Sequence, residues 1–401
     1  MTTARRSVLG LLGTASLAAG ASLAASGPAS AATPAGTAAD TRSGAPGSGQ
    51  VPAGLRPGGE LDRLVADLAA RDAFSGSVLV AHRGRPVLAR AHGLANRELS
   101  IPNGTDTLFI LGSVTKLFTA VAVAQLAQRG ELAFQGKLGD YLDGFPAEIA
   151  GTVTVHQLLT HTSGMGDYHR NPAFWELKDG WDSEQEVMDG IAAIIRGEPL
   201  GFVPGTGYAY SNSAFHVLGQ IVARVSGRPY HDYVREHVFR AAGMTSADFY
   251  TMPQWRADRR IARPYATGED GERYDAIAEH GFVGTPAGGS FAHCADLARF
   301  AHALTHGELL DPAHTALLLG GRVPMPMRTA PGTQSVFEGY GQLVVHVGGR
   351  VVLSRNGGSP GVSTDMEVLP AGDLTVVALS NYDMRTVEPV ASLARRLLAG
   401  G

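Results

Sequence analysis

Residues 111–125 read LGSVTKLFTAVAVAQ, in which Lys116, three residues after Ser113, stands at the opening of a predicted apolar helix. These two residues are three positions apart, so on a helix their side chains lie on one face. Only three of the 33 basic residues are lysines, at positions 116, 137 and 178. A buried ammonium can lose its proton and accept one from a serine hydroxyl, whereas a guanidinium stays charged. The structural alternative is a serine that caps the helix and a lysine at the surface.

A second polar group precedes another amphipathic helix, in PGTGYAYSNSAFHVLGQIVARVSG at 204–227. If the segment from Tyr210 to Asn212 is extended, both side chains point the same way. A phenol can relay protons and an amide can hold a substrate carbonyl, which suits acyl transfer. The structural alternative is that Asn212 caps the following helix.

A third stretch, SRNGGSPG at 354–361, places Arg355 and Asn356 before Gly357 and Gly358 in a β-like neighbourhood. An arginine beside glycines can cradle a phosphate, serve an active site or close a hairpin. The local sequence alone does not choose among these three functions.

The chain carries, in this order, Ser113-Val114-Thr115-Lys116, Tyr210-Ser211-Asn212 and a basic residue before a glycine pair. These three stretches resemble the three motifs of the serine β-lactamase and penicillin-binding family. The resemblance is strongest to its class C β-lactamase and D-alanyl-D-alanine carboxypeptidase branch. It covers roughly residues 60–400, with supporting stretches at 153–165, 287–300 and 374–381. It implies a β-lactamase/transpeptidase-like fold.

The resemblance also implies residue roles. Ser113 would be the acylated nucleophile, and Lys116 and Tyr210 would share general-base and general-acid duty. The backbone N–H groups of Ser113 and Gly358 would form the oxyanion hole. The substrate-binding residues implied in this way are Asn212, Arg355, Asn356, Gly357 and Gly358.

The third motif departs from the family pattern, which usually has lysine or histidine followed by threonine or serine where this chain has Arg355 and Asn356. Arginine can hold a carboxylate through two hydrogen bonds but does not donate its proton near neutral pH. We therefore expect Arg355 to act as an electrostatic clamp for an anionic substrate.

The secondary-structure pattern predicts an α+β fold. A helix at 60–72 and a β-hairpin at 74–93 are followed by a mostly helical subdomain at about 113–310. Apolar strand patterns return at 340–349, 350–358 and 363–381, and a helix closes the chain at 388–400. The terminal strands should form one antiparallel sheet flanked by the terminal helices, with the site between sheet and subdomain. The hydrolase domain thus spans residues 58–401.

The N-terminal sequence predicts export. Arg5 and Arg6 precede an apolar run that ends in a small-residue cleavage site, so residues 1–31 read as a signal peptide. The paired arginines are compatible with the twin-arginine route and with ordinary secretion, and a retained anchor is the alternative. Residues 32–57 are predicted to be a flexible leader, and no later segment is expected to span a membrane.

Other signals narrow the function. A net charge of -4 gives no reason to expect nucleic-acid binding. His302 and His306 are four residues apart but show no third ligand, so we predict neither a metal site nor a cofactor. His161 is expected to make a structural hydrogen bond, and Cys294 is expected to be a buried, unreactive thiol. Tyr168, Phe174, Trp175 and Trp181 either line a substrate pocket or anchor a loop.

The sequence as a whole indicates an exported serine hydrolase that forms an acyl-enzyme. The default substrate is a D-alanyl-D-alanine-type cell-wall peptide, because the cell wall lies outside the membrane. An esterase or a β-lactamase is the alternative within the family. A penicillin-binding sensor that is acylated without turnover is the alternative from another class.

Overall fold

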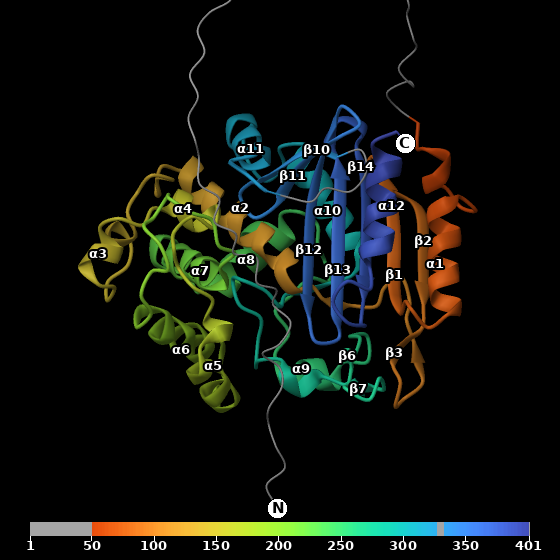
Figure 1. Ribbon diagram of the computed structural model, residues 1–401, viewed down its shortest axis with the longest axis horizontal. Coiled ribbons are helices and arrows are strands. Elements are labelled where there is room, and N and C mark those ends of the chain that lie inside the picture. Colours follow the sequence, from red (N-terminus) through yellow and green to blue (C-terminus); the bar gives the residue numbers. More distant parts are fainter. Residues whose placement is uncertain (1–49, 327–332, 401) are drawn as a thin grey trace, which may run out of the picture. The chain divides into compact units, whose positions relative to one another are not determined.

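A computed structural model describes residues 50–326 and 333–400, and the predicted signal peptide and residues 32–49 of the predicted leader lie outside these ranges. Its centre is an eight-stranded antiparallel sheet with the strand order β2-β1-β14-β13-β12-β11-β10-β9 (Figure 1). Strands from both ends of the chain are adjacent, since β1 pairs with β14 from Gly76↔Ser380 to His82↔Leu374. The predicted α+β fold and the joining of the terminal strands are confirmed.

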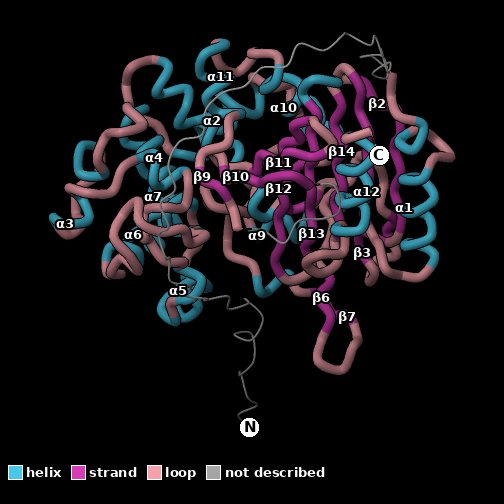
Figure 2. Tube along the Cα trace, turned by 45° about the horizontal axis from the view of Figure 1, so that its top comes forward, coloured by secondary structure: helices cyan, strands magenta, loops and turns pink. Residues whose placement is uncertain are grey.

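The sheet contains the predicted hairpin and the predicted C-terminal strands. Its members are β1 (Gly76–His82), β2 (Arg85–His92), β9 (Val323–Pro324), β10 (Thr333–Glu338), β11 (Leu343–Val347), β12 (Arg350–Ser359), β13 (Val362–Leu369) and β14 (Leu374–Ser380). Strands β9 and β10 were not predicted. Three short pairs were not predicted either, because strands of two or three residues show no periodicity. They are β3 (Leu94–Asn96) with β4 (Ile101–Pro102), β5 (Phe109–Ile110) with β8 (Phe291–Ala292), and β6 (Tyr265–Thr267) with β7 (Arg273–Asp275), the last forming a separate hairpin (Figure 2).

Helices cover both faces of the sheet. On one face, α1 (Glu60–Ala70) and α12 (Glu388–Leu398) share a core with apolar residues of β1 and β14, as predicted. On the other face lies α10 (Cys294–Thr305), which contacts β1 and β14. The sequence had placed α10 in the helical subdomain, but its apolar face packs on the sheet.

Helix α2 (Thr115–Gln128) carries the residues that follow Ser113. The remaining helices are α3 (Ala147–Ala150), α4 (Val155–Leu159), α5 (Pro172–Leu177), α6 (Glu184–Arg196), α7 (Asn212–Ser226), α8 (Tyr230–Val234), α9 (Met252–Ala257) and α11 (Pro312–Leu319). Of these, α7, α8 and α11 pack against α2. Every residue of α2 from Thr115 to Leu126 is buried, because the helix is apolar on all sides. Of the helices in the described ranges, none has the length and apolar composition of a membrane span.

Two carboxyl groups lie beneath α12. Asp365 and Glu367 are two residues apart on β13, so both side chains lie on the same face of the sheet. This face meets Arg395, which donates a hydrogen bond to Glu367. Ser354 on β12 also donates to Glu367, at 2.9 Å. Burial, followed by the neighbouring charge of Glu367, raises the pKa of Asp365 well above its usual range. The folded protein therefore favours the protonated form of Asp365.

This raised pKa predicts a pH effect on stability. A carboxyl whose pKa is higher in the folded state stabilises the fold most at low pH, and this contribution is lost as pH rises from the unfolded value of about 3.9. The substitution Asp365→Asn should remove this pH-dependent loss of stability. From pH 5 to pH 8, the free energy of unfolding of the variant should fall less than that of wild type in urea titrations. Asp67→Asn, at the surface, is the control, and an identical pH dependence in wild type and Asp365→Asn would refute the assignment.

Candidate active site

Ser113 lies at the junction of η2 (Gly112–Val114) and α2, and Lys116 lies in the first turn of α2. The predicted shared face is confirmed, since Lys116 Nζ is 3.2 Å from Ser113 Oγ. The alternative of a surface lysine is wrong, because Lys116 is 0 % exposed. The apolar helix thus buries the ammonium beside the serine.

Tyr210 completes a hydrogen-bonded group around Ser113. Its phenolic oxygen is 2.7 Å from Ser113 Oγ. Ser211, not Asn212, caps α7, because its Oγ accepts from Ala214 N at 2.9 Å. This cap leaves the Asn212 amide free to face the site, where its Oδ1 accepts from Lys116 Nζ at 2.7 Å. Tyr210 and Asn212 therefore point to one side, as predicted.

The buried ammonium of Lys116 has three acceptors. Besides Ser113 and Asn212, the carbonyl oxygen of Ala287 accepts from Nζ at 2.5 Å. The stretch that carries Ala287 is held in place because Ser290 O accepts from Leu111 N at 2.8 Å and β8 pairs with β5. A buried charge needs such partners to offset the lost hydration.

The charges in this group shift the pKa values of two residues. Burial lowers the pKa of Lys116, although the neighbouring Tyr210 opposes the shift. Burial of the phenol would raise the pKa of Tyr210, but the charges of Lys116 and Arg355 outweigh it and lower this pKa. The residue is 40 % exposed overall, and its hydroxyl end lies among Ser113, Lys116 and Arg355. The Tyr210 hydroxyl therefore ionises to the phenolate at a lower pH than an isolated tyrosine does.

Arg355 on β12 reaches the same group. Its Nε donates to Ser113 O at 3.0 Å and its Nη2 donates to Tyr210 OH at 3.2 Å. Its Nη1 faces Glu338 Oε1 at 3.9 Å, and Glu338 Oε2 accepts from Tyr208 OH at 2.9 Å. Arg355 is 5 % exposed, so its positive charge acts inside the protein. Sequence reasoning missed Glu338, because this acid stands on a separate strand with no motif around it.

Glycines allow β12 to approach the serine. A Cβ at Gly357 would lie 2.2 Å from Leu111 O and 2.7 Å from Ser113 N. A Cβ at Gly112, where φ is +51°, would lie 2.8 Å from Gly358 N. No side chain tolerates such distances, so Gly357 and Gly112 are required for the close approach. The backbones that carry the predicted oxyanion donors are thereby in contact.

Asn356, which follows Arg355 in the third motif, is placed differently. Asn356 is exposed and pairs with Asp365 on β13, on the α12 side of the sheet. Side chains alternate along a strand, so Asn356 faces away from Arg355 and from Ser113. The structure does not bring the Asn356 side chain to the site, contrary to the role implied by its motif position. Only its backbone belongs to the strand that lines Ser113.

Two further residues belong to the site that the sequence did not single out. Asp167 Oδ2 accepts from Asn212 Nδ2 at 2.9 Å, and Asp167 Oδ1 lies 3.1 Å from His169 Nδ1. Although burial opposes it, bonds and charge from His169, with a bond from Asn212, lower the pKa of Asp167. The sequence signal was their position directly after the family-like stretch 153–165. Together they extend the polar chain from Lys116 through Asn212.

His161 makes the structural hydrogen bond that we predicted. Its Nδ1 accepts from Ser211 N at 3.1 Å, and its ring lies 4.6 Å from that of Tyr210. Burial lowers the pKa of His161 well below its usual range, so the imidazole is neutral. It orders the segment before α7.

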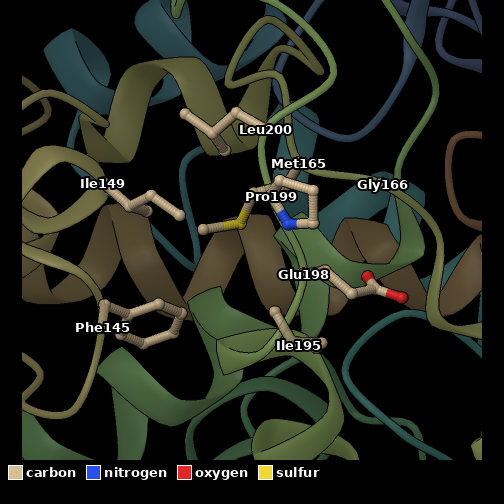
Figure 3. Close-up of a pocket in the computed structure, with 8 residues that line it drawn as sticks. All are labelled: Phe145, Ile149, Met165, Gly166, Ile195, Glu198, Pro199 and Leu200. Carbon is tan, nitrogen blue, oxygen red and sulfur yellow. The ribbon is translucent and has the colours of Figure 1, made fainter.

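The aromatic residues between the first two motifs differ in their burial. Tyr168 and Phe174 are buried and pack against each other, whereas Trp175 is 44 % exposed. A small, mostly apolar pocket nearby is lined by Phe145, Ile149, Met165, Gly166, Ile195, Glu198, Pro199 and Leu200 (Figure 3). None of the motif residues lines this pocket, so the polar group around Ser113 defines the candidate site instead.

The family model described as Beta-lactamase matches residues 61–400. The chain belongs to the beta-lactamase family. With Ser113, Lys116 and Tyr210 in mutual contact, this beta-lactamase family member is a serine hydrolase.

Its relatives include penicillin-binding proteins and an esterase. Penicillin-binding protein 4* of Bacillus subtilis (strain 168) is 30 % identical over 357 residues, which cover 85 % of this chain and 76 % of the relative. Esterase EstB of Burkholderia gladioli is 36 % identical over 207 residues, 48 % of this chain and 50 % of the relative. The crystal structure of a penicillin binding protein from Bacillus halodurans is 28 % identical, with a TM-score of 0.72, and covers 83 % of this chain and 98 % of that one.

The contact between β12 and η2 predicts the effect of one added methyl group. Gly357→Ala must push β12 away from Leu111 and Ser113, and a displacement of about 1 Å costs roughly 100-fold in rate. We expect kcat/KM for an aryl ester to fall by about that factor. Gly180→Ala is the matched control, because a Cβ there has no neighbour within 4 Å. Full activity in Gly357→Ala would show that this approach is not needed.

The charge of Arg355 predicts a pH effect on rate. If the Tyr210 phenolate accepts the serine proton, kcat/KM rises with pH through the pKa of Tyr210, which lies below 10. Arg355→Gln removes a charge that lowers this pKa, so the rising limb should move to higher pH, with a loss of about 10- to 100-fold near pH 7. Arg355→Lys keeps the charge and should keep the limb close to its wild-type position. A limb that Arg355→Gln leaves unmoved would contradict this role.

Proposed function

We propose that this protein is an exported carboxypeptidase that cleaves D-alanyl-D-alanine-type peptides through an acyl-enzyme on Ser113. One observation carries the proposal: Ser113 Oγ lies within hydrogen-bond distance of both Tyr210 OH, at 2.7 Å, and Lys116 Nζ, at 3.2 Å. A serine hydroxyl needs a neighbouring base to become a nucleophile at neutral pH. Both candidate bases have a lowered pKa, which suits that duty.

In the proposed reaction, the Tyr210 phenolate accepts the Ser113 proton while Ser113 Oγ attacks the substrate carbonyl carbon, and the Lys116 ammonium stabilises the phenolate. The backbone N–H groups of Ser113 and Gly358 stabilise the oxyanion. Tyr210 then passes the proton to the leaving amine as the peptide C–N bond breaks. Water hydrolyses the resulting ester by the reverse sequence of proton transfers, which releases the acid and restores the Ser113 hydroxyl.

Two roles for Arg355 are compatible with this function. As a substrate clamp it would bind the carboxylate of a D-alanyl terminus. As an electrostatic partner it would stabilise the Tyr210 phenolate. Its low exposure and its bonds to Ser113 O and Tyr210 OH favour the second action over direct contact with substrate.

The name of the first relative, a penicillin-binding protein, supports the peptide substrate. A second candidate activity is ester hydrolysis. It is supported by the 36 % identity to Esterase EstB across 207 aligned residues. Export, which makes cell-wall peptide the default substrate, rests on residues 1–31. A sensor that is acylated without turnover remains the alternative outside catalysis.

Replacement of the nucleophile tests the proposal. Wild type and Ser113→Ala should be compared on a D-alanyl-D-alanine peptide, a chromogenic cephalosporin and a short-chain aryl ester. We expect the peptide to give the highest kcat/KM, and Ser113→Ala to lose at least about 1,000-fold on every substrate that wild type turns over. Circular dichroism should show that the variant is folded.

The other outcomes are distinct. Activity that survives Ser113→Ala would refute the mechanism. Preference for the ester would identify an esterase, and preference for the cephalosporin a β-lactamase. Stoichiometric labelling of wild type by a fluorescent penicillin, without turnover of any substrate, would identify the sensor.

A further inference from the structure

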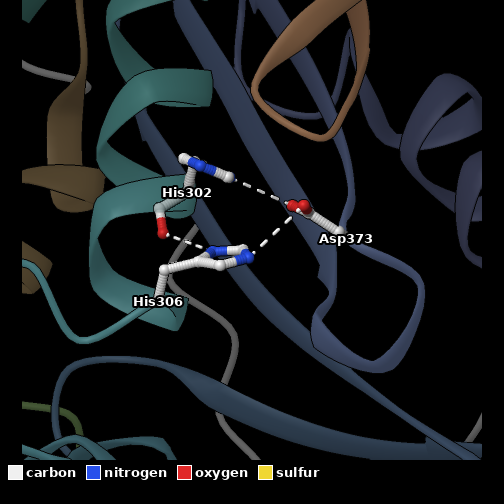
Figure 4. A group of neighbouring side chains, drawn as sticks. All are labelled: His302, His306 and Asp373. Carbon is white, nitrogen blue, oxygen red and sulfur yellow. Dashed lines mark hydrogen bonds and ion pairs between the residues drawn. The ribbon is translucent and has the colours of Figure 1, made fainter.

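Two histidines and an aspartate meet at the last turn of α10. His302 Nδ1 lies 3.2 Å from Asp373 Oδ1, and His306 Nε2 lies 3.4 Å from Asp373 Oδ2 (Figure 4). The two imidazole rings are 4.0 Å apart. The spacing of His302 and His306 was visible in the sequence, but the third ligand was not, because Asp373 follows 71 residues after His302.

This cluster is separate from the active site. Thr364 on β13 contacts Leu111, the residue two before Ser113, whereas Asp373 lies in the turn that joins the far end of β13 to β14. From Thr364 to Leu369 the strand alone spans roughly 17 Å. None of the three cluster residues takes part in the proposed reaction.

We propose that His302, His306 and Asp373 bind a divalent transition-metal ion of the zinc type. A metal with ligands at about 2.0–2.1 Å in a tetrahedron holds neighbouring ligand atoms about 3.3 Å apart. The distance of 3.2 Å from His302 to Asp373 Oδ1 and that of 3.4 Å from His306 to Asp373 Oδ2 are each close to that spacing. All three candidate ligand atoms lie within 4.8 Å of one another, so small side-chain rotations close the site.

The hydrogen bond of His306 explains why an ion fits between these groups. Its Nδ1 lies 2.9 Å from the carbonyl oxygen of His302, which can only accept, so Nδ1 carries a proton. Nε2, which faces Asp373 at 3.4 Å, is therefore the nitrogen that can offer a lone pair to an ion. Metal-bound histidines commonly donate their other ring N–H to a carbonyl in this way.

The cluster is held by three parts of the fold. Arg83 N, in the β1–β2 turn, donates to Asp373 O at 2.9 Å and fixes the backbone of that residue. Gly84 in the same turn packs against the ring of His302, since a Cβ there would lie 3.3 Å from its Cγ. An ion at this place would fasten α10 to two turns of the sheet. Cys294 is the only cysteine, so no intramolecular disulfide can supply such a link.

The donor set selects the metal class. Two imidazoles and one carboxylate suit Zn²⁺ and its transition-metal neighbours, whereas Mg²⁺ and Ca²⁺ prefer oxygen ligands. Three protein ligands leave a fourth position for water. His306 is the most exposed of the three, with 42 % of its side chain accessible, so an ion can enter from solvent.

The test is zinc binding by the full chain without a histidine tag. Titration calorimetry should show one Zn²⁺ bound per chain, and Zn²⁺ but not Mg²⁺ should raise the Tm. His306→Gln and Asp373→Asn should each weaken Zn²⁺ binding by at least about tenfold and remove the rise in Tm. Asparagine suits the left-handed backbone of Asp373, where φ is +47°, so Asp373→Asn should fold normally. The Ser113-dependent rate without added metal should stay at the wild-type value in both variants.

His314→Gln is the matched control, because His314 also lies 3.0 Å from an aspartate, Asp311, but in a pair within one helical turn. It should leave Zn²⁺ binding and the rise in Tm intact. The proposal is overturned if wild type shows no Zn²⁺ binding, if Asp373→Asn and His306→Gln bind Zn²⁺ as tightly as wild type, or if only His314→Gln loses binding.

Discussion

The burial of one ammonium group, that of Lys116, is the constraint on which the site depends. A cation that is fully withdrawn from water needs compensating partners, and here they come from distant parts of the chain: Ser113, Asn212 and the carbonyl of Ala287. Those partners require η2, α7 and the segment before β8 to meet around α2. The same contacts that give the Lys116 ammonium its hydrogen-bond partners therefore also position Ser113.

The third motif, on β12, adds charge rather than a proton donor. Arg355 reaches Ser113 O and Tyr210 OH only because Gly357 and Gly112 let β12 approach η2 without side chains between them. With Lys116 it surrounds one phenol with two positive charges, which stabilise the phenolate. The arginine that departs from the family pattern is thus used where permanent charge matters and where proton transfer by this residue is not required.

Much of this could be predicted from the sequence. The antiparallel sheet, the terminal helices and the meeting of Ser113, Lys116, Tyr210 and Asn212 follow from strand alternation, helical periodicity and motif order. The rest depends on tertiary contacts that local patterns do not encode. The Ala287 carbonyl is a backbone group that any residue offers, Glu338 and Asp373 are single acids without a motif, and the outward direction of Asn356 depends on the exact register of β12. The packing of α10 on the sheet was missed for the same reason.

The charges of Lys116 and Arg355 should hold Tyr210 ready to accept a proton, and titration of Tyr210 itself can check this. Tyrosine labelled with ¹³C at Cζ, assigned through Tyr210→Phe, reports phenol ionisation by NMR. We expect Tyr210 to titrate below the ordinary tyrosine pKa of about 10 in wild type and at higher pH in Lys116→Met. A Tyr210 that titrates at or above 10 in wild type, or that is unchanged in Lys116→Met, would contradict this expectation.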